Sequence, residues 1–243
     1  MPWDFWLIFL FLAVLLPWRG HSRLKNLLAT PHVGIVQRLS LYASTIAFQW
    51  FAVAVVGWRA WAHGYSPSEL GLATSGRMRI AFVAVLGAAI LAAGQWLNLR
   101  RMGRFSSPRT AFFRALAQRI FPQSSIEFLP YLALALTAGL CEEFLYRGFA
   151  MAVLLRAGLP LWSVVLLSAV LFGLAHLYQR RGGFVSTLVI GTVFGTARIA
   201  YDSLIPVMAW HAAVDVVAGI AGPRYLSQAP NPASEREIQP RGH

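Results

Sequence analysis

The chain has few charged residues and almost no cysteine. Cys141 is the only cysteine among 243 residues, so a disulfide bond within the chain is excluded. A nucleophilic thiol at Cys141 is disfavoured, because small buried cysteines usually only pack. Charged residues make up 12% of the chain and hydrophobic residues 57%, with a mean hydropathy of +0.57. Soluble domains carry about 25% charged residues, so this composition indicates an integral membrane protein.

The chain contains several long apolar runs. A helical run of about 20 residues, rising about 1.5 Å per residue, crosses the roughly 30 Å hydrocarbon core of a bilayer. We therefore predict an all-α polytopic membrane bundle of about seven spans. The predicted spans are residues 3–18, 39–58, 80–99, 128–155, 159–178, 184–200 and 203–220. The first run has no basic residue ahead of it and no small-residue cleavage site after it, so we interpret it as a span and not as a secretion signal.

Basic residues outnumber acidic residues by 21 to 9, which gives a net charge of +12. They alternate between loops and form no single basic face, so we do not expect nucleic acid as a partner. Fifteen of them lie in the connections 19–38, 100–127 and 179–183 and in the tail from 221. The positive-inside rule makes these segments cytoplasmic and the N-terminus external. The excess of arginine over lysine suggests a GC-rich bacterial source, and hence a bacterial inner membrane.

Three regions are predicted along the chain. Residues 1–127 contain the N-terminal spans and a cytoplasmic amphipathic helix that starts at Ser107 and Pro108, with its arginines directed at lipid phosphates. Residues 128–220 contain nearly all the polar chemistry within the spans. Residues 221–243 are rich in proline and have no apolar period, which predicts a disordered cytoplasmic tail.

Glu142 and Glu143 lie side by side in an apolar run and are followed by Arg147. Ionisable groups within a span are costly, so they indicate a functional site by default. On a helix the two carboxyl groups point about 100° apart, and Glu143 faces Arg147 at i,i+4. Glu143 and Arg147 are therefore expected to pair, either as support for a site or as a lock between helices. Glu142 has no partner on its own helix and is the candidate general base.

Two further predicted spans carry polar residues at i,i+4 spacing. Phe172 and His176 share one helix face, as do His211 and Asp215. A histidine–aspartate pair on a membrane helix is either part of a site or a hydrogen bond between helices. Counting about 1.5 Å per residue from the predicted outer ends places Glu142 and these three polar residues within about two helical turns of a common depth.

The ordered patterns Glu142-Glu143-x-x-x-Arg147, Phe172-x-x-x-His176 and His211-x-x-x-Asp215 resemble the CPBP family of intramembrane proteases. This family includes the type II CAAX prenyl endopeptidases and the bacterial Abi proteins. The resemblance covers residues 128–220, and Asp215 stands where the prenyl endopeptidases usually have asparagine.

The resemblance implies hydrolysis of a peptide bond in a membrane-associated protein or peptide. Carried over by position, Glu142 and His176 would activate water, and His211 and Asp215 would stabilise the oxyanion. Glu143, Arg147 and Phe172 would support them. In a metal-free mechanism Asp215 must be protonated, because an ionised carboxylate would repel the oxyanion.

Two questions remain open in the sequence. Two histidines with carboxylates can bind Zn²⁺, through Glu142, His176, His211 and Asp215, although no two histidines share a helix as in HExxH metalloproteases. We favour a reaction without a cofactor.

A transporter and a non-catalytic membrane scaffold or immunity protein are the alternative functions, but a transporter usually shows an internal repeat, and none is evident.

Overall fold

The computed structural model describes residues 1–73, 75–105 and 107–226, which form helices and turns without a strand. The predicted all-α polytopic bundle is confirmed. Six helical stretches in the described chain are long and apolar enough to cross a membrane: Trp3–Ala29, Ile35–Ala62, Arg77–Arg104, Ser125–Arg156, Leu177–Tyr201 and Ile205–Leu226. The remaining predicted span corresponds to Leu161–Ala175, whose 15 residues extend only about 22 Å.

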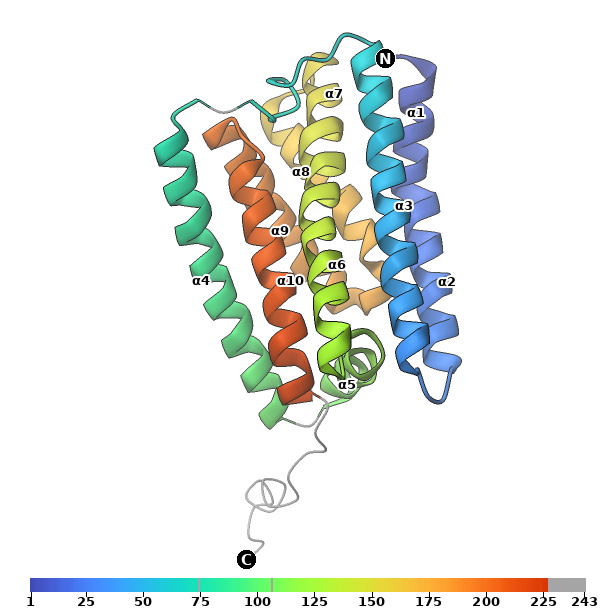
Figure 1. The fold of residues 1–243 in the computed structure, drawn as a ribbon. Helices are drawn as coiled ribbons and strands as arrows, with labels where there is room; N and C mark the ends of the chain where they lie inside the picture. The colour runs from blue at the N-terminus through green and yellow to red at the C-terminus, as the bar shows by residue number, and fades with distance from the viewer. Residues whose placement is uncertain (74, 106, 227–243) are drawn as a thin grey trace, which may run out of the picture.

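The helices run roughly alongside one another and alternate in direction (Figure 1). The N-terminus lies at one end of the bundle, and α5 (Pro108–Ile120) lies across the other, which we call the α5 end. α10 (Ile205–Leu226) ends at the α5 end and packs between α4 (Arg77–Arg104) and α6 (Ser125–Glu143). The two ends of the described chain therefore lie at opposite ends of the bundle.

The first helix is longer than predicted. α1 (Trp3–Leu10), the π-helical η1 (Phe11–Leu15) and α2 (Leu16–Ala29) follow one another without a break, so the helix continues 11 residues beyond the predicted end at residue 18. Arg19 and Arg23 are half-buried against the protein. Because Arg19 lies over the ring of Phe48 and Arg23 donates to Ser44 and Thr45, both side chains are accommodated by α3, and the helix continues past them.

Two predictions at the α5 end need correction. Ser107 begins α5 as predicted, since its Oγ accepts a hydrogen bond from the backbone N–H of Thr110. However, Arg119 does not point toward lipid phosphates: it donates to the carbonyl oxygens of Leu27 and Thr30, at the end of α2. α10 also continues six residues beyond the predicted end at 220, and the remainder of the predicted disordered tail lies outside the described residues.

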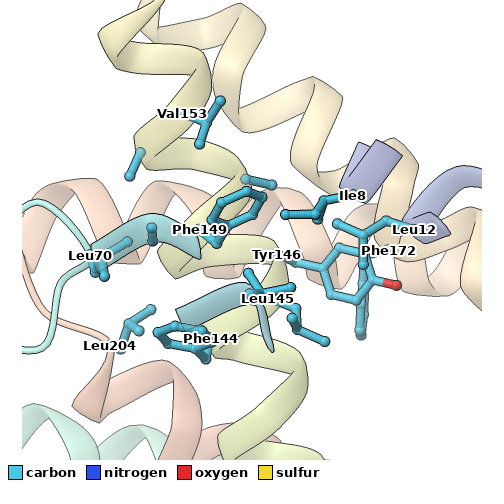
Figure 2. Close-up of a cluster of buried hydrophobic side chains, with 14 of the residues drawn as sticks. Ile8, Leu12, Leu70, Phe144, Leu145, Tyr146, Phe149, Val153, Phe172 and Leu204 are labelled. Carbon is cyan, nitrogen blue, oxygen red and sulfur yellow. The ribbon is translucent and has the colours of Figure 1, made fainter. Parts of the chain in front are cut away.

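The buried core surrounds a π-helical segment, η2 (Phe144–Ala150), which joins α6 to α7 (Met151–Arg156). All seven residues of η2 are buried. Figure 2 shows Phe149 beside Ile8 and Phe144 near Leu70, so the N-terminal helix and the loop before α4 both pack on η2. π-Helical turns are uncommon and are frequent at functional sites. This one directly follows Glu142 and Glu143.

At the end opposite α5, Arg156 fastens the loop that follows α3 (Ile35–Ala62). Its guanidinium donates to Glu69 Oε1 and to the carbonyl oxygens of His63 and Gly64. The backbone N–H of Ser66 also donates to Glu69 and, together with Arg156, lowers the pKa of that carboxyl group to about 2. Glu69 therefore stays ionised at neutral pH, although both partners of the pair are well exposed.

The fifth and sixth crossings form a hairpin of α8 (Leu161–Ala175) and α9 (Arg180–Tyr201). They are joined by a single 3₁₀ turn, η3 (Leu177–Gln179). Arg180 opens α9 with a φ of 67°, a conformation that non-glycine residues rarely adopt. Because α8 is short and ends in this turn, His176 at its C-cap faces the interior of the bundle, where it lines a cavity.

Candidate active site

Glu142 lies at the centre of the predicted site. Its Oε1 accepts a hydrogen bond of 2.8 Å from Gln49 Nε2 on α3. Its Oε2 lies 4.0 Å from His176 Nε2 and 4.0 Å from His211 Nε2. Three helices that are distant in the sequence thus bring their polar groups to one carboxyl group. The gaps of 4.0 Å are too long for direct hydrogen bonds, but one water molecule about 2.8 Å from each atom fits such a gap.

The orientation of His176 follows from its contact with the backbone. Its Nδ1 lies 2.9 Å from the carbonyl oxygen of Phe172. A carbonyl oxygen only accepts, so Nδ1 carries the proton in this hydrogen bond. In the neutral ring, Nε2 is then an acceptor that faces the carboxyl group of Glu142. Two acceptors that lie 4.0 Å apart need a molecule between them that donates a hydrogen bond to each, and a water molecule can do so.

Glu143 and Arg147 form the predicted pair, and both side chains are 0% exposed. Arg147 Nη1 donates to Glu143 Oε1 over 2.9 Å, and the guanidinium lies 4.2 Å from the ring centre of Phe172. Glu143 Oε1 also lies 2.8 Å from His211 Nδ1. The pair therefore does more than join turns of one helix: it fixes the ring of His211, whose other nitrogen points toward Glu142.

Asp215 lies at the edge of the group. Its Oδ2 is 3.6 Å from His211 Nε2, within ion-pair range but beyond a hydrogen bond. Its side chain is 36% exposed, and its backbone carbonyl oxygen accepts a hydrogen bond from Tyr131. The structure thus brings the sequence-predicted residues together. The side chain of Asp215 is more exposed than those of Glu142, His176 and His211.

The small residue Gly139 permits this convergence. A Cβ atom at Gly139 would lie 2.8 Å from the backbone nitrogen of Ala212 and 2.9 Å from the carbonyl oxygen of Met208. Because backbone atoms cannot give way like a flexible side chain, only glycine allows α6 and α10 to approach this closely. Glu142 and Glu143 follow Gly139 by one turn, so the same contact places them beside His211.

A cavity of about 570 Å³ opens onto Glu142 and His176. Its walls come from α2, α3, α6, η2 and the turn after α8. A volume of this size is typical of a pocket for a small ligand or a few residues of a peptide. Tyr146 lines it too, and its hydroxyl is buried without a hydrogen-bond partner among the described residues.

The predicted zinc ligands are spaced more widely than a zinc site requires. Ligands that share a tetrahedral Zn²⁺ at about 2.1 Å lie about 3.4 Å apart, whereas both histidine nitrogens lie 4.0 Å from Glu142 Oε2. Within the described part of the chain, no group of three or more His, Cys, Asp and Glu residues has the arrangement of a metal site. The residues as placed do not fit the metal, and we derive no step through it.

Sequence reasoning missed two residues of this site. Gln49 holds Glu142, but it lies in a span that was assigned no chemistry; a single amide in the middle of an uncharged span is the signal that could have found it. Tyr146 is the i,i+4 neighbour of Glu142, a spacing that by itself assigns it no role. Its buried hydroxyl and its place on the cavity wall became visible only with the packing of α2 and α8.

The comparison with protein families agrees with this geometry. Residues 123–217 match the family described as type II CAAX prenyl endopeptidase Rce1-like. The matched segment contains every residue of the three sequence patterns and confirms the resemblance seen in the sequence. No curated protein and no solved structure matches the chain. The match covers less than half of the chain and supports a CAAX-type intramembrane protease in general. It favours an enzyme over the transporter and scaffold interpretations.

Proposed function

We propose that the protein hydrolyses a peptide bond of a membrane-associated protein or peptide with water activated by Glu142 and His176, without a metal. The observation that carries this proposal is the convergence of Glu142 Oε2 and the Nε2 atoms of His176 and His211, at the end of a cavity that can receive a peptide.

The proposed reaction uses each residue for one task. Glu142 takes a proton from the water as its oxygen attacks the scissile carbonyl carbon, and His176 Nε2 accepts the second hydrogen bond of that water and orients it. In this proposal His211 is an imidazolium that donates from Nδ1 to Glu143 and from Nε2 to the developing oxyanion. Protonated Asp215 donates a second hydrogen bond to that oxyanion. When the carbon–nitrogen bond breaks, Glu142 returns the proton to the leaving amine.

Replacement of Glu142 by glutamine tests the proposal. Glutamine keeps the size of the side chain but cannot accept a proton, so Glu142→Gln is expected to lower kcat/KM by about 100-fold or more. Glu69→Gln, in the exposed loop far from the cavity, is the matched control and should cleave like the parent. Substrates are sought as proteins that accumulate uncleaved in membranes of a Glu142→Gln strain.

Two measurements make the test decisive. Thermal unfolding of the purified variant in detergent should match the parent, which shows that the loss is chemical. Cleavage by Glu142→Gln at the parental rate, or parental activity that a chelator abolishes, would overturn the metal-free, glutamate-based mechanism.

A further inference from the structure

The α5 end of the bundle carries exposed arginines that the proposed chemistry does not use. They lie on the last two turns of α4 and the last turn of α10, and we call them the arginine cluster: Arg100, Arg101, Arg104 and Arg224. None of them lies in the segment 123–217 that matches the protease family. Within residues 1–73, 75–105 and 107–226, no carboxylate forms an ion pair with a member of the cluster.

The two helix ends that carry the cluster pack directly against each other (Figure 1). The rings of Trp96 and Tyr225 meet edge to face, with their centres 5.7 Å apart. A Cβ atom at Gly103 would lie 2.7 Å from the carbonyl oxygen of Tyr225. Arg104 follows Gly103 and Arg224 precedes Tyr225, so this contact brings arginines of both helices to one surface.

The length of α4 places the cluster at the surface of the membrane. Residues 80–99 contain no charged side chain, and 20 helical residues rise about 30 Å, which is the thickness of the hydrocarbon core. Arg100 therefore emerges at the headgroup level at the α5 end, and Arg79 emerges at the opposite surface. Tryptophan and tyrosine are typical of this boundary, and Trp96 and Tyr225 lie beside the cluster.

The capping of helix ends accounts for only part of the charge. The C-terminal end of a helix carries about half a negative charge, which basic residues in its last turn stabilise. The ends of α4 and α10 thus supply about one negative charge against the four guanidinium groups of the cluster. An excess of about three positive charges remains. An anion that carries more than one charge complements this surface.

We propose that the arginine cluster binds the headgroup of an anionic phospholipid with two phosphates, such as cardiolipin, in the leaflet at the α5 end. Two phosphodiesters carry two negative charges and offset the excess better than one. Each guanidinium fork can donate two hydrogen bonds to the oxygens of a phosphate. Basic surfaces between membrane helices suit such headgroups. The acyl chains would lie along the lipid-facing side of α4, where Ile90 and Leu97 are 61% and 50% exposed.

The test measures the binding of three lipids to the full-length protein in detergent: cardiolipin, phosphatidylglycerol and phosphatidylcholine. Cardiolipin is expected to raise the unfolding temperature most, phosphatidylglycerol less and phosphatidylcholine not at all. Arg100→Gln combined with Arg104→Gln should weaken the Kd for cardiolipin about 25-fold, because each arginine near an anionic surface contributes about fivefold. Arg77→Gln combined with Arg79→Gln, at the other end of the same helix, is the matched control and should keep the parental Kd.

The outcomes separate a lipid site from a general attraction and from a folding defect. A parental Kd in the Arg100→Gln, Arg104→Gln variant, or equal weakening in the control, would overturn the proposal. Equal stabilisation by all three lipids would refute it too, because the phosphates would then not be recognised. Arg100→Lys combined with Arg104→Lys keeps both charges and should keep most of the affinity; a loss as large as with glutamine would assign the effect to packing. Added salt should weaken the binding of cardiolipin to the parent, and salt-independent binding would count against the cluster.

Discussion

Removal of Arg147 should destabilise the protein more than any loss of a surface charge. The side chain is wholly buried, bonds Glu143 over 2.9 Å and lies 4.2 Å from the ring centre of Phe172. Arg147→Ala leaves the buried Glu143 without its cation, a change that typically costs about 3–5 kcal/mol. For a chain of this length, 1 kcal/mol lowers the unfolding temperature by about 2–4 °C, so the expected fall is about 6–20 °C.

The assay is thermal unfolding in detergent, followed by the fluorescence of the tryptophans. Arg156→Ala is the matched control, because its pair with Glu69 is 37% and 42% exposed and such pairs contribute about 1 kcal/mol or less. Adding Glu143→Gln to Arg147→Ala should restore part of the loss, since no charge is then left unpaired. Activity should not return with it, because Glu143 also fixes His211. An Arg147→Ala protein that unfolds at the parental temperature yet is inactive would refute the structural role and assign Arg147 to the reaction itself.

Two further predictions concern Asp215 and Gly139. Asp215→Asn should keep activity and extend it to higher pH, because the amide donates a hydrogen bond that a carboxylic acid loses when it ionises. Asp215→Ala should lose activity. The measurement is the pH–rate profile of both variants with and without a chelator, and an inactive Asp215→Asn with a chelator-sensitive parent would favour zinc. Gly139→Ala should lower both stability and activity, because the added methyl group forces α6 away from α10. Gly94→Ala is the control and should be tolerated, since a Cβ atom there meets open space. Equal unfolding temperatures for the two variants would contradict the close-packing argument.

Each predicted span corresponds to a helical stretch, because hydrocarbon thickness demands a long apolar run wherever a helix crosses the membrane. It was least accurate where protein, not lipid, surrounds the polar groups. Arg19 and Arg23 marked the end of the first predicted span, but they face the cavity inside a helix that continues to Ala29. Arg119 was predicted to reach lipid phosphates, but it donates to the last carbonyl groups of α2. Composition alone cannot distinguish a charge that faces lipid headgroups from one that meets a neighbouring helix.

The sequence predicted which residues gather at the site but not which of them contact one another. The spacing of Glu143 and Arg147 predicted their pairing, because i,i+4 neighbours meet on any helix. The contact of Glu143 with His211 joins residues 68 positions apart, and no local pattern carries that information. The i,i+4 spacing of His211 and Asp215 correctly placed them on one face, but the ring of His211 is held by Glu143 and not by Asp215.

Part of the cavity wall comes from helices that precede the matched segment. The matched segment supplies Glu142, His176 and His211, whereas Gln49 and the cavity-lining Arg19 and Arg23 come from helices that precede it. Gln49 bonds one oxygen of Glu142, so the preceding helices also set the direction of the other oxygen toward the histidines. The carboxyl group of Glu142 is therefore oriented by α3, one of the two preceding helices that line the cavity. If the proposed mechanism is correct, we expect substitutions of cavity-lining residues on α2 and α3 to alter selectivity without replacing Glu142, provided that the hydrogen bond from Gln49 is kept.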